Sequence, residues 1–277
     1  MAARFWVGGS GTWNASNTAN WAATSGGAGG QSVPTSADTV TIDANSGSGT
    51  ITVATDFSIT SLTCGAMNMT LDFSVNNNNP TMSTFSGTGT GTRTLNMGGG
   101  IWTITGTGTV WNLATITNLT FNAQQSKILI SNTSATACTF STGNLTYYTL
   151  EYGRGGGGGQ LIFSGTCTIT NFIDLTSTAA HVISFTAAQT FSFHRFNVKG
   201  SAGALVTINR VGGSNPTLTK IGRGIVCYCD YITMGTVSCT PSNTWYIGAN
   251  SSIGTSSGTI ASNAPSSQSL LGIGGVG

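Results

Sequence analysis

The sequence predicts an all-β chain wound into a right-handed parallel β-solenoid, with an aromatic cap at the N-terminus and a Gly/Ser-rich tail at the C-terminus. Only nine Lys or Arg and seven Asp or Glu occur among 277 residues, whereas Gly occurs 40 times. Thr, Ser and β-branched residues alternate along most of the chain, which favours pleated strands and tight turns. No segment keeps an apolar stripe of helical period, so we expect little helix.

Short segments with a period of two residues are the main signal of strands. Clusters of Asn, Gly and Pro at 76–80, 98–100 and 212–216 are typical of the turns between them. The segments that alternate most clearly are 39–42, 50–53, 59–63, 92–95, 102–105, 115–120 and 166–170. Strands and turns therefore succeed each other along most of the chain.

A coarser repeat is superimposed on this alternation. Related short motifs, such as Ile-Thr-Ser-Leu-Thr and Ile-Thr-Asn-Leu-Thr-Phe, are centred on Leu62, Leu95, Leu119, Leu145, Phe172, Phe196 and Tyr231, at intervals of 33, 24, 26, 27, 24 and 35 residues. A coil of about two dozen residues accommodates two or three short strands with their turns, which is one rung of a β-solenoid. The unequal intervals indicate insertions at the turns.

Three regions follow from this pattern: a cap or attachment region at 1–45, the solenoid at 46–247 and a tail at 248–277. A solenoid has an open strand edge at each end, and an uncovered edge promotes aggregation. We expect aromatic residues to cap these edges or, alternatively, to form contact surfaces: Phe5, Trp6, Trp13 and Trp21 at one end, and Trp245 and Tyr246 at the other. In the tail, Leu270, Leu271 and Ile273 form an aliphatic patch for which we expect a role in assembly.

The composition argues against two kinds of partner. The basic residues are dispersed from Arg4 to Arg223 and the net charge is +2, so we expect no nucleic-acid surface. No window reaches the run of about eighteen apolar residues that a membrane span needs, so we expect no membrane insertion. The start of the chain lacks the apolar core of a secretory signal, so we expect a product that is made in the cytoplasm and not secreted.

The cysteines are expected to be buried thiols, because they are scattered along a chain with no sign of secretion. They are Cys64, Cys138, Cys167, Cys227, Cys229 and Cys239. Cys227 and Cys229 point to the same face of a strand. Neither Cys239 nor His194 lies at the spacing of a zinc site, so we expect no metal and no cofactor.

Catalysis by paired carboxylates is the main alternative to a structural role. Polysaccharide-cleaving enzymes need two carboxylates about 5 to 9.5 Å apart. The acids here are dispersed: Asp38, Asp43, Asp56, Asp72, Glu151, Asp174 and Asp230. Asp38 and Asp43 are five residues apart, which directs them to opposite faces and favours turn or cap roles. A pairing of Asp72 with Asp174 across rungs is left open by the sequence.

Two further alternatives have weaker support. His181 and His194 fit no hydrolase pattern, because the chain has no G-x-S-x-G motif to supply a nucleophile. Thr-x-Thr pairs on a flat solenoid face can order water and bind ice. Ice binding would require the pairs to stack on one face at constant coil length, and the unequal intervals argue against such regularity.

Three segments carry a resemblance to known proteins. The N-terminal block combines Arg4–Trp13 (Arg-Phe-Trp-Val-Gly-Gly-Ser-Gly-Thr-Trp), Asn20-Trp21 and Ser32–Asp43. Together with the segments 106–115 and 245–251, this block resembles repetitive β-solenoid virion proteins of tailed bacteriophages and, more loosely, bacterial autotransporter adhesins. The similarity covers about residues 4 to 251.

The resemblance implies a non-enzymatic structural component of a phage virion, such as a fibre, a spike or a surface decoration protein. The expected partners are other virion proteins and further copies of the chain, in a homo-oligomer with a trimer favoured. Contact with host surface glycans is a further expectation. A polysaccharide-cleaving β-helix of the tailspike type is the alternative, and an ice-binding solenoid is a more distant one.

Overall fold

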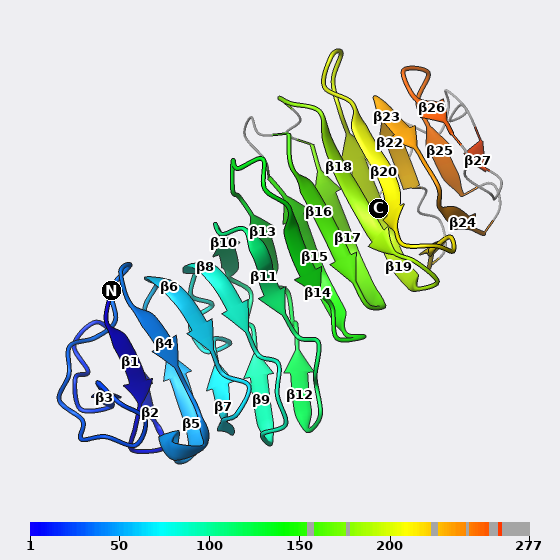
Figure 1. The fold of residues 1–277 in the computed structure, drawn as a ribbon. Coiled ribbons are helices and arrows are strands. Elements are labelled where there is room, and N and C mark those ends of the chain that lie inside the picture. Colours follow the sequence, from blue (N-terminus) through cyan, green and yellow to red (C-terminus); the bar gives the residue numbers. More distant parts are fainter. Residues whose placement is uncertain (154–157, 176–177, 223–226, 242–243, 255–259, 262–277) are drawn as a thin grey trace, which may run out of the picture.

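The computed structural model describes residues 1–277 apart from 154–157, 176–177, 223–226, 242–243, 255–259 and 262–277. The strands stack into successive turns of a parallel β-solenoid, which confirms the predicted all-β solenoid fold. Figure 1 shows the turns side by side along one axis, from the blue strand β1 (Ala3–Trp6) to the orange strand β25 (Trp245–Ile247). The described helical structure is a single 3-10 turn, η1 (Ala44–Ser46).

Each turn contributes up to three strands, so the hydrogen bonds between turns form three parallel ladders along the axis. The first ladder consists of β1, β4 (Thr39–Thr41), β6 (Phe57–Thr63), β8 (Pro80–Ser86), β11 (Gly108–Asn112), β14 (Cys138–Ser141), β16 (Gln160–Ser164), β18 (His181–Thr186), β20 (Val206–Val211), β23 (Ile232–Met234) and β26 (Ser252–Ile253). A short strand, β3 (Trp21–Ala22), pairs antiparallel with β1 at the N-terminal end.

The second ladder begins with the first halves of β6 and β8. It continues through β10 (Ile101–Ile104), β13 (Lys127–Ile130), β15 (Thr146–Tyr152), β17 (Cys167–Asp174), β19 (Thr190–Lys199), β22 (Cys227–Asp230), β25 and β27 (Ile260–Ala261). Because β26 and β27 still pair with the preceding turn, the first and second ladders extend past residue 247.

The third ladder has two parts. The first part consists of β2 (Gly11–Trp13), β5 (Ser48–Val53), β7 (Asn68–Asp72), β9 (Arg93–Asn96) and β12 (Leu119–Asn122), which form the lower row in Figure 1. The second part consists of the first halves of β15, β17 and β19, followed by β21 (Thr217–Lys220) and β24 (Ser238–Thr240).

Inward side chains form one continuous apolar core, in which aromatic rings are in register from turn to turn. Phe85, Trp111, Phe140, Phe163 and Phe185 are successive partners in the first ladder. Their ring centroids are 4.3, 5.6, 5.9 and 4.9 Å apart, and each ring is buried. A column of five aromatic rings therefore runs along the axis, and dispersion contacts within it favour this register.

The structure confirms the length of the sequence repeat but not its alignment. Leu62 pairs with Phe85, 23 residues later, which matches a coil of about two dozen residues. Leu95, however, pairs with Phe121, and Leu119 pairs with Arg93. The motif centres identified in the sequence are therefore misaligned. Leu62 belongs to the first ladder and Leu95 to the third, and similar Thr-rich motifs occur on both faces.

The cross-section of the solenoid changes in its middle. In the earlier turns a loop separates the strand of the third ladder from that of the second, as at residues 97–100 and 123–126. In β15, β17 and β19 one continuous strand covers both ladders. The third ladder is broken at this change, because in the described structure β12 pairs with β9 alone and the first half of β15 pairs with β17 alone.

Candidate functional site

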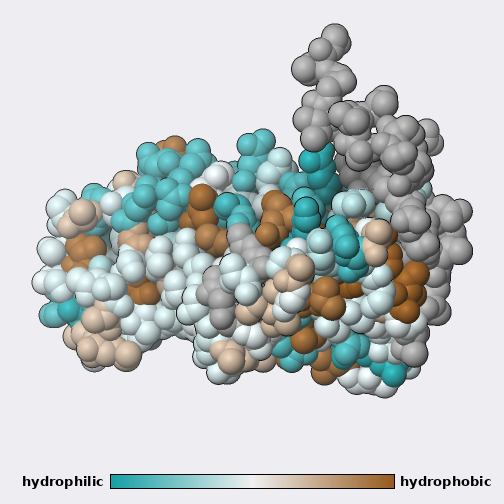
Figure 2. Space-filling model, turned by 90° about the horizontal axis from the view of Figure 1, so that it is seen from above, coloured by the Kyte–Doolittle hydropathy of each residue, from teal (hydrophilic) through white to brown (hydrophobic). Residues whose placement is uncertain are grey.

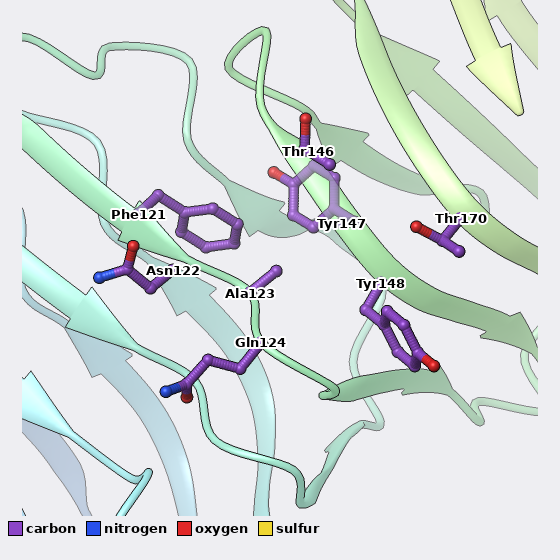
Figure 3. Close-up of a pocket in the computed structure, with 8 residues that line it drawn as sticks. All are labelled: Phe121, Asn122, Ala123, Gln124, Thr146, Tyr147, Tyr148 and Thr170. Carbon is purple, nitrogen blue, oxygen red and sulfur yellow. The ribbon is translucent and has the colours of Figure 1, made fainter. Parts of the chain in front are cut away.

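The break in the third ladder coincides with an open cavity of about 580 Å³. Two consecutive turns and the edge of a third line it, as Figure 3 shows: Phe121, Asn122, Ala123, Gln124, Thr146, Tyr147, Tyr148 and Thr170. The loop at 123–126 is present in one turn and absent from the next, so the two strands do not come into hydrogen-bonding register here. None of the eight lining residues carries a charge at neutral pH.

Side-chain contacts replace the missing backbone ladder at the base of this cavity. The rings of Phe121 and Tyr147 meet edge to face, with centroids 5.2 Å apart. Tyr147 is buried, and its hydroxyl donates a hydrogen bond of 2.8 Å to the carbonyl oxygen of Thr142. Burial raises the pKa of Tyr147 well above the ordinary value, so this phenol stays neutral.

The amide side chains on the β12 side are held by the preceding turn. Asn122 Nδ2 donates a hydrogen bond of 2.8 Å to Asn96 Oδ1, and Gln124 Oε1 accepts one from the backbone N–H of Gly98. Figure 3 shows both amides directed away from Tyr147. Tyr148 lies on the opposite side of the cavity, and 36% of its surface is exposed. The cavity thus combines an exposed aromatic ring with neutral polar walls, which suits binding better than acid-base chemistry.

The carboxylates act within their own loops or between neighbouring turns. In loops, Asp38 accepts hydrogen bonds from Thr35, Asp43 from Asn45, and Asp72 from Ser74. Between turns, Asp56 accepts hydrogen bonds from Asn78 and Asn79, Asp230 accepts one from Asn250, and Glu151 forms an ion pair with Lys127. The turn and cap roles predicted for Asp38 and Asp43 are confirmed.

Asp72 and Asp174 do not form a pair. Asp72 ends β7 in the third ladder and Asp174 ends β17 in the second, four turns further along. At ~4.8 Å per turn this separation is about 19 Å, beyond the range of either glycosidase geometry. Asp174 instead lies 2.6 Å from His181 Nε2 in the core, where both side chains are almost fully buried. That position keeps the pair away from solvent.

Arg93 has a structural role that the sequence did not reveal. It is 2% exposed and has no carboxylate partner among the described contacts. Its guanidinium donates hydrogen bonds of 2.8 to 3.1 Å to four carbonyl oxygens, those of Gly87, Gly91, Thr115 and Thr117. Arg93 therefore links the loops of two successive turns by hydrogen bonds.

All six cysteines are buried thiols, as predicted. Burial raises the pKa of Cys64, Cys227 and Cys239 to about 12, so these thiols are unreactive at neutral pH. Within the residues that the structure describes, three or more His, Cys, Asp or Glu side chains do not gather as metal ligands. The same residues contain no apolar helix of the length that a membrane crossing requires.

The outer face of the third ladder carries stacked hydroxyls. Before the break, Thr50, Thr70, Thr94 and Thr120 form one column, whereas the neighbouring column is Thr52, Asp72, Asn96 and Asn122. After it, Thr190, Thr217 and Ser238 stack beside Ser192, Thr219 and Thr240. The stacking is therefore regular within each part of the ladder, because the length differences lie in the turns, but it is interrupted at the break between β12 and β15.

The aromatic residues expected to act as caps or contacts lie in different environments. Trp6, Trp13, Trp21 and Trp245 are buried, and Trp21 packs edge to face on both Trp6 and Trp13. Trp13 also stacks on Phe57 of the following turn, with centroids 4.1 Å apart. Phe5 and Tyr246 are partly exposed. The expected assembly residues Leu270, Leu271 and Ile273 lie outside the described residues.

Comparison with known proteins finds no matching family model, no matching curated protein and no matching solved structure. Figure 2 shows a surface on which apolar residues form separate patches among polar ones.

Proposed function

We propose that the chain is a non-enzymatic structural component of a phage particle, in the form of a fibre, a spike or a surface decoration protein. The observation that carries the proposal is the use of all seven carboxylates, which cap loops, connect neighbouring turns or lie buried in the core. A general acid-base pair needs two accessible carboxylates at a set distance. The one pair that the sequence left open is about four turns apart.

A mechanical role suits the rest of the architecture. The stability of each turn depends on contacts with its neighbours. These contacts include the in-register aromatic column and the hydrogen bonds of Arg93. Such a body acts as a rigid rod that can present polar surfaces at fixed spacing. Several copies in a homo-oligomer, which we expect to be a trimer, would combine weak contacts with host glycans into firm attachment.

The proposal is tested on gradient-purified particles. Peptide mass spectrometry should find the chain in intact particles after washing in high salt, and the purified chain should release no sugar from host surface polysaccharide. A chain found in the lysate but not in particles would contradict the structural role. Release of oligosaccharides that Asp72→Asn or Asp230→Asn abolishes would instead favour the polysaccharide-cleaving alternative.

The hydroxyl columns favour ice binding as a second candidate. Thr240 Oγ1 donates a hydrogen bond of 3.1 Å to Thr219 Oγ1, so hydroxyls of adjacent turns are ordered relative to one another. If this array binds ice, the purified chain will inhibit ice recrystallisation and Thr219→Tyr will abolish the effect. Equal inhibition by the wild type and the variant would exclude this array as the ice-binding face.

A further inference from the structure

The open edge of β12 presents backbone groups toward the cavity. The carbonyl oxygens of Asn118 and Asn122 accept hydrogen bonds from the N–H groups of Arg93 and Met97 in the preceding turn. In a parallel strand, alternate residues direct their N–H and C=O groups to opposite sides. The backbone groups of Phe121 therefore face the break, where the described structure supplies no paired strand. Such groups require a hydrogen-bonding partner from solvent or a ligand.

The opposite side of the cavity carries an aromatic ring flanked by hydroxyls. Tyr147 pairs with Ile169 and Thr149 with Asn171, so Tyr148 lies opposite Thr170 of the next turn. Thr146, two residues earlier, points to the same side of the strand as Tyr148. In the described structure, Tyr148 and Tyr228 are the aromatic residues whose side chains are well exposed, at 36% and 45%.

From these features we propose that the cavity between β12 and β15 binds a neutral saccharide, with the ring of Tyr148 as the platform for one sugar ring. A pyranose has an apolar C–H face, which suits an aromatic ring, and a rim of hydroxyls, which suits Thr146, Thr170 and the backbone of Phe121. The cavity volume of about 580 Å³ lies within the usual range for small-ligand sites.

The uncharged lining selects the chemical class of the ligand. Phosphate, sulfate and uronate groups are normally bound by Arg, Lys or clustered N–H donors, and no charged side chain lines this cavity. Lys127 and Glu151, on the adjoining ladder, form an ion pair of 3.0 Å with each other. The inference depends on the proposed function only for the source of the saccharide, which would be the host surface.

Saturation-transfer NMR on the full chain tests the site with linear hexasaccharides of glucose, mannose and galactose, and with hexagalacturonate as the charged probe. We expect binding of at least one neutral hexasaccharide and none of hexagalacturonate. Tyr148→Ala should weaken that binding about tenfold, because the stacking contact is lost. Tyr148→Phe keeps the ring and should stay within about threefold of the wild type. Tyr228→Ala, a matched change of an exposed Tyr outside the cavity, should leave binding unchanged.

Three results would overturn the inference: binding of none of the neutral hexasaccharides, equal binding by all four probes, or equal losses in Tyr148→Ala and Tyr228→Ala. Hydrogen exchange gives an independent readout in assembled particles. Protection of the Phe121 amide without any saccharide would mean that a strand of a partner chain fills the break, and this result would also overturn the inference. Particle incorporation of Tyr148→Ala is measured separately, so a failed saccharide site remains distinguishable from a failed structural role.

Discussion

At the scale of single residues, the few charged side chains stabilise corners where the chain changes direction. Arg93 is the clearest case, because it lies in the core and satisfies the carbonyl oxygens of two successive loops. Desolvation lowers the pKa of its guanidinium, and hydrogen bonds to four carbonyl oxygens offset that cost. A low content of charged residues therefore does not mean that the charges are unimportant.

Replacing Arg93 should destabilise the fold strongly. Arg93→Met has a similar length but leaves four carbonyl oxygens without their donor, so we expect a loss of at least about 3 kcal/mol in the free energy of unfolding. Urea denaturation measures this loss. Arg4→Met is the matched control. Arg4 hydrogen-bonds Ser32 at the surface, so this variant should lose no more than about 0.5 kcal/mol in the free energy of unfolding. Similar losses of unfolding free energy in both variants would contradict the proposed role of Arg93 in linking the two loops.

Asp56 should contribute to a pH dependence of stability. The backbone N–H of Asn79, joined by the side-chain amides of Asn78 and Asn79, lowers the pKa of Asp56 below its ordinary value of 3.8. A lowered pKa in the folded state stabilises the fold above that ordinary value, and this contribution disappears as the pH falls through the folded pKa. Asp56→Asn should therefore melt earlier than the wild type at pH 7, with a difference that shrinks toward pH 2. A difference independent of pH would show that the charge is not involved.

At the scale of elements, the sequence predicts strands well and their alignment poorly. Period-two patterns placed strands at 39–42, 50–53 and 59–63, and the structure has strands there. The repeat was misaligned because Leu95 and Leu119 occur in similar Thr-rich motifs but differ in register by two residues. The cavity was not predictable, since it depends on one turn having the loop at 123–126 and the next lacking it.

The N-terminal strands offer a test of the capping hypothesis. Trp13 is buried between Trp21 and Phe57, so Trp13→Ala should cost about 3 to 5 kcal/mol and expose the edge of the first turn to aggregation. Thermal melting and light scattering measure both effects. Phe5→Ala removes a partly exposed ring from the same region and should cost less. Unchanged melting and solubility of Trp13→Ala would indicate that the N-terminal aromatic residues form a contact surface instead of a cap.

At the scale of the whole molecule, three ladders around one core form a rod. The tail that follows has few aliphatic side chains in its sequence. Ordering a residue costs about 1 to 2 kcal/mol, so the composition of the tail favours stabilisation by a partner. Deleting residues 264–277 should leave the melting temperature nearly unchanged but prevent oligomerisation or incorporation into particles. Thermal melting measures the first effect. Light scattering after size exclusion measures oligomerisation, and particle assembly assays measure incorporation. Normal assembly of the truncated chain would shift the anchoring role to the N-terminal aromatic block.

We propose that this solenoid is built into a phage particle, and a cryo-electron microscopy map of the native particle tests the proposal most directly. We expect rods at symmetry-related positions, with turns spaced by ~4.8 Å and continuous aromatic density from β8 to β18 of the first ladder. A map in which no such rod occurs, from particles that infect normally, would contradict a role of the chain in the particle.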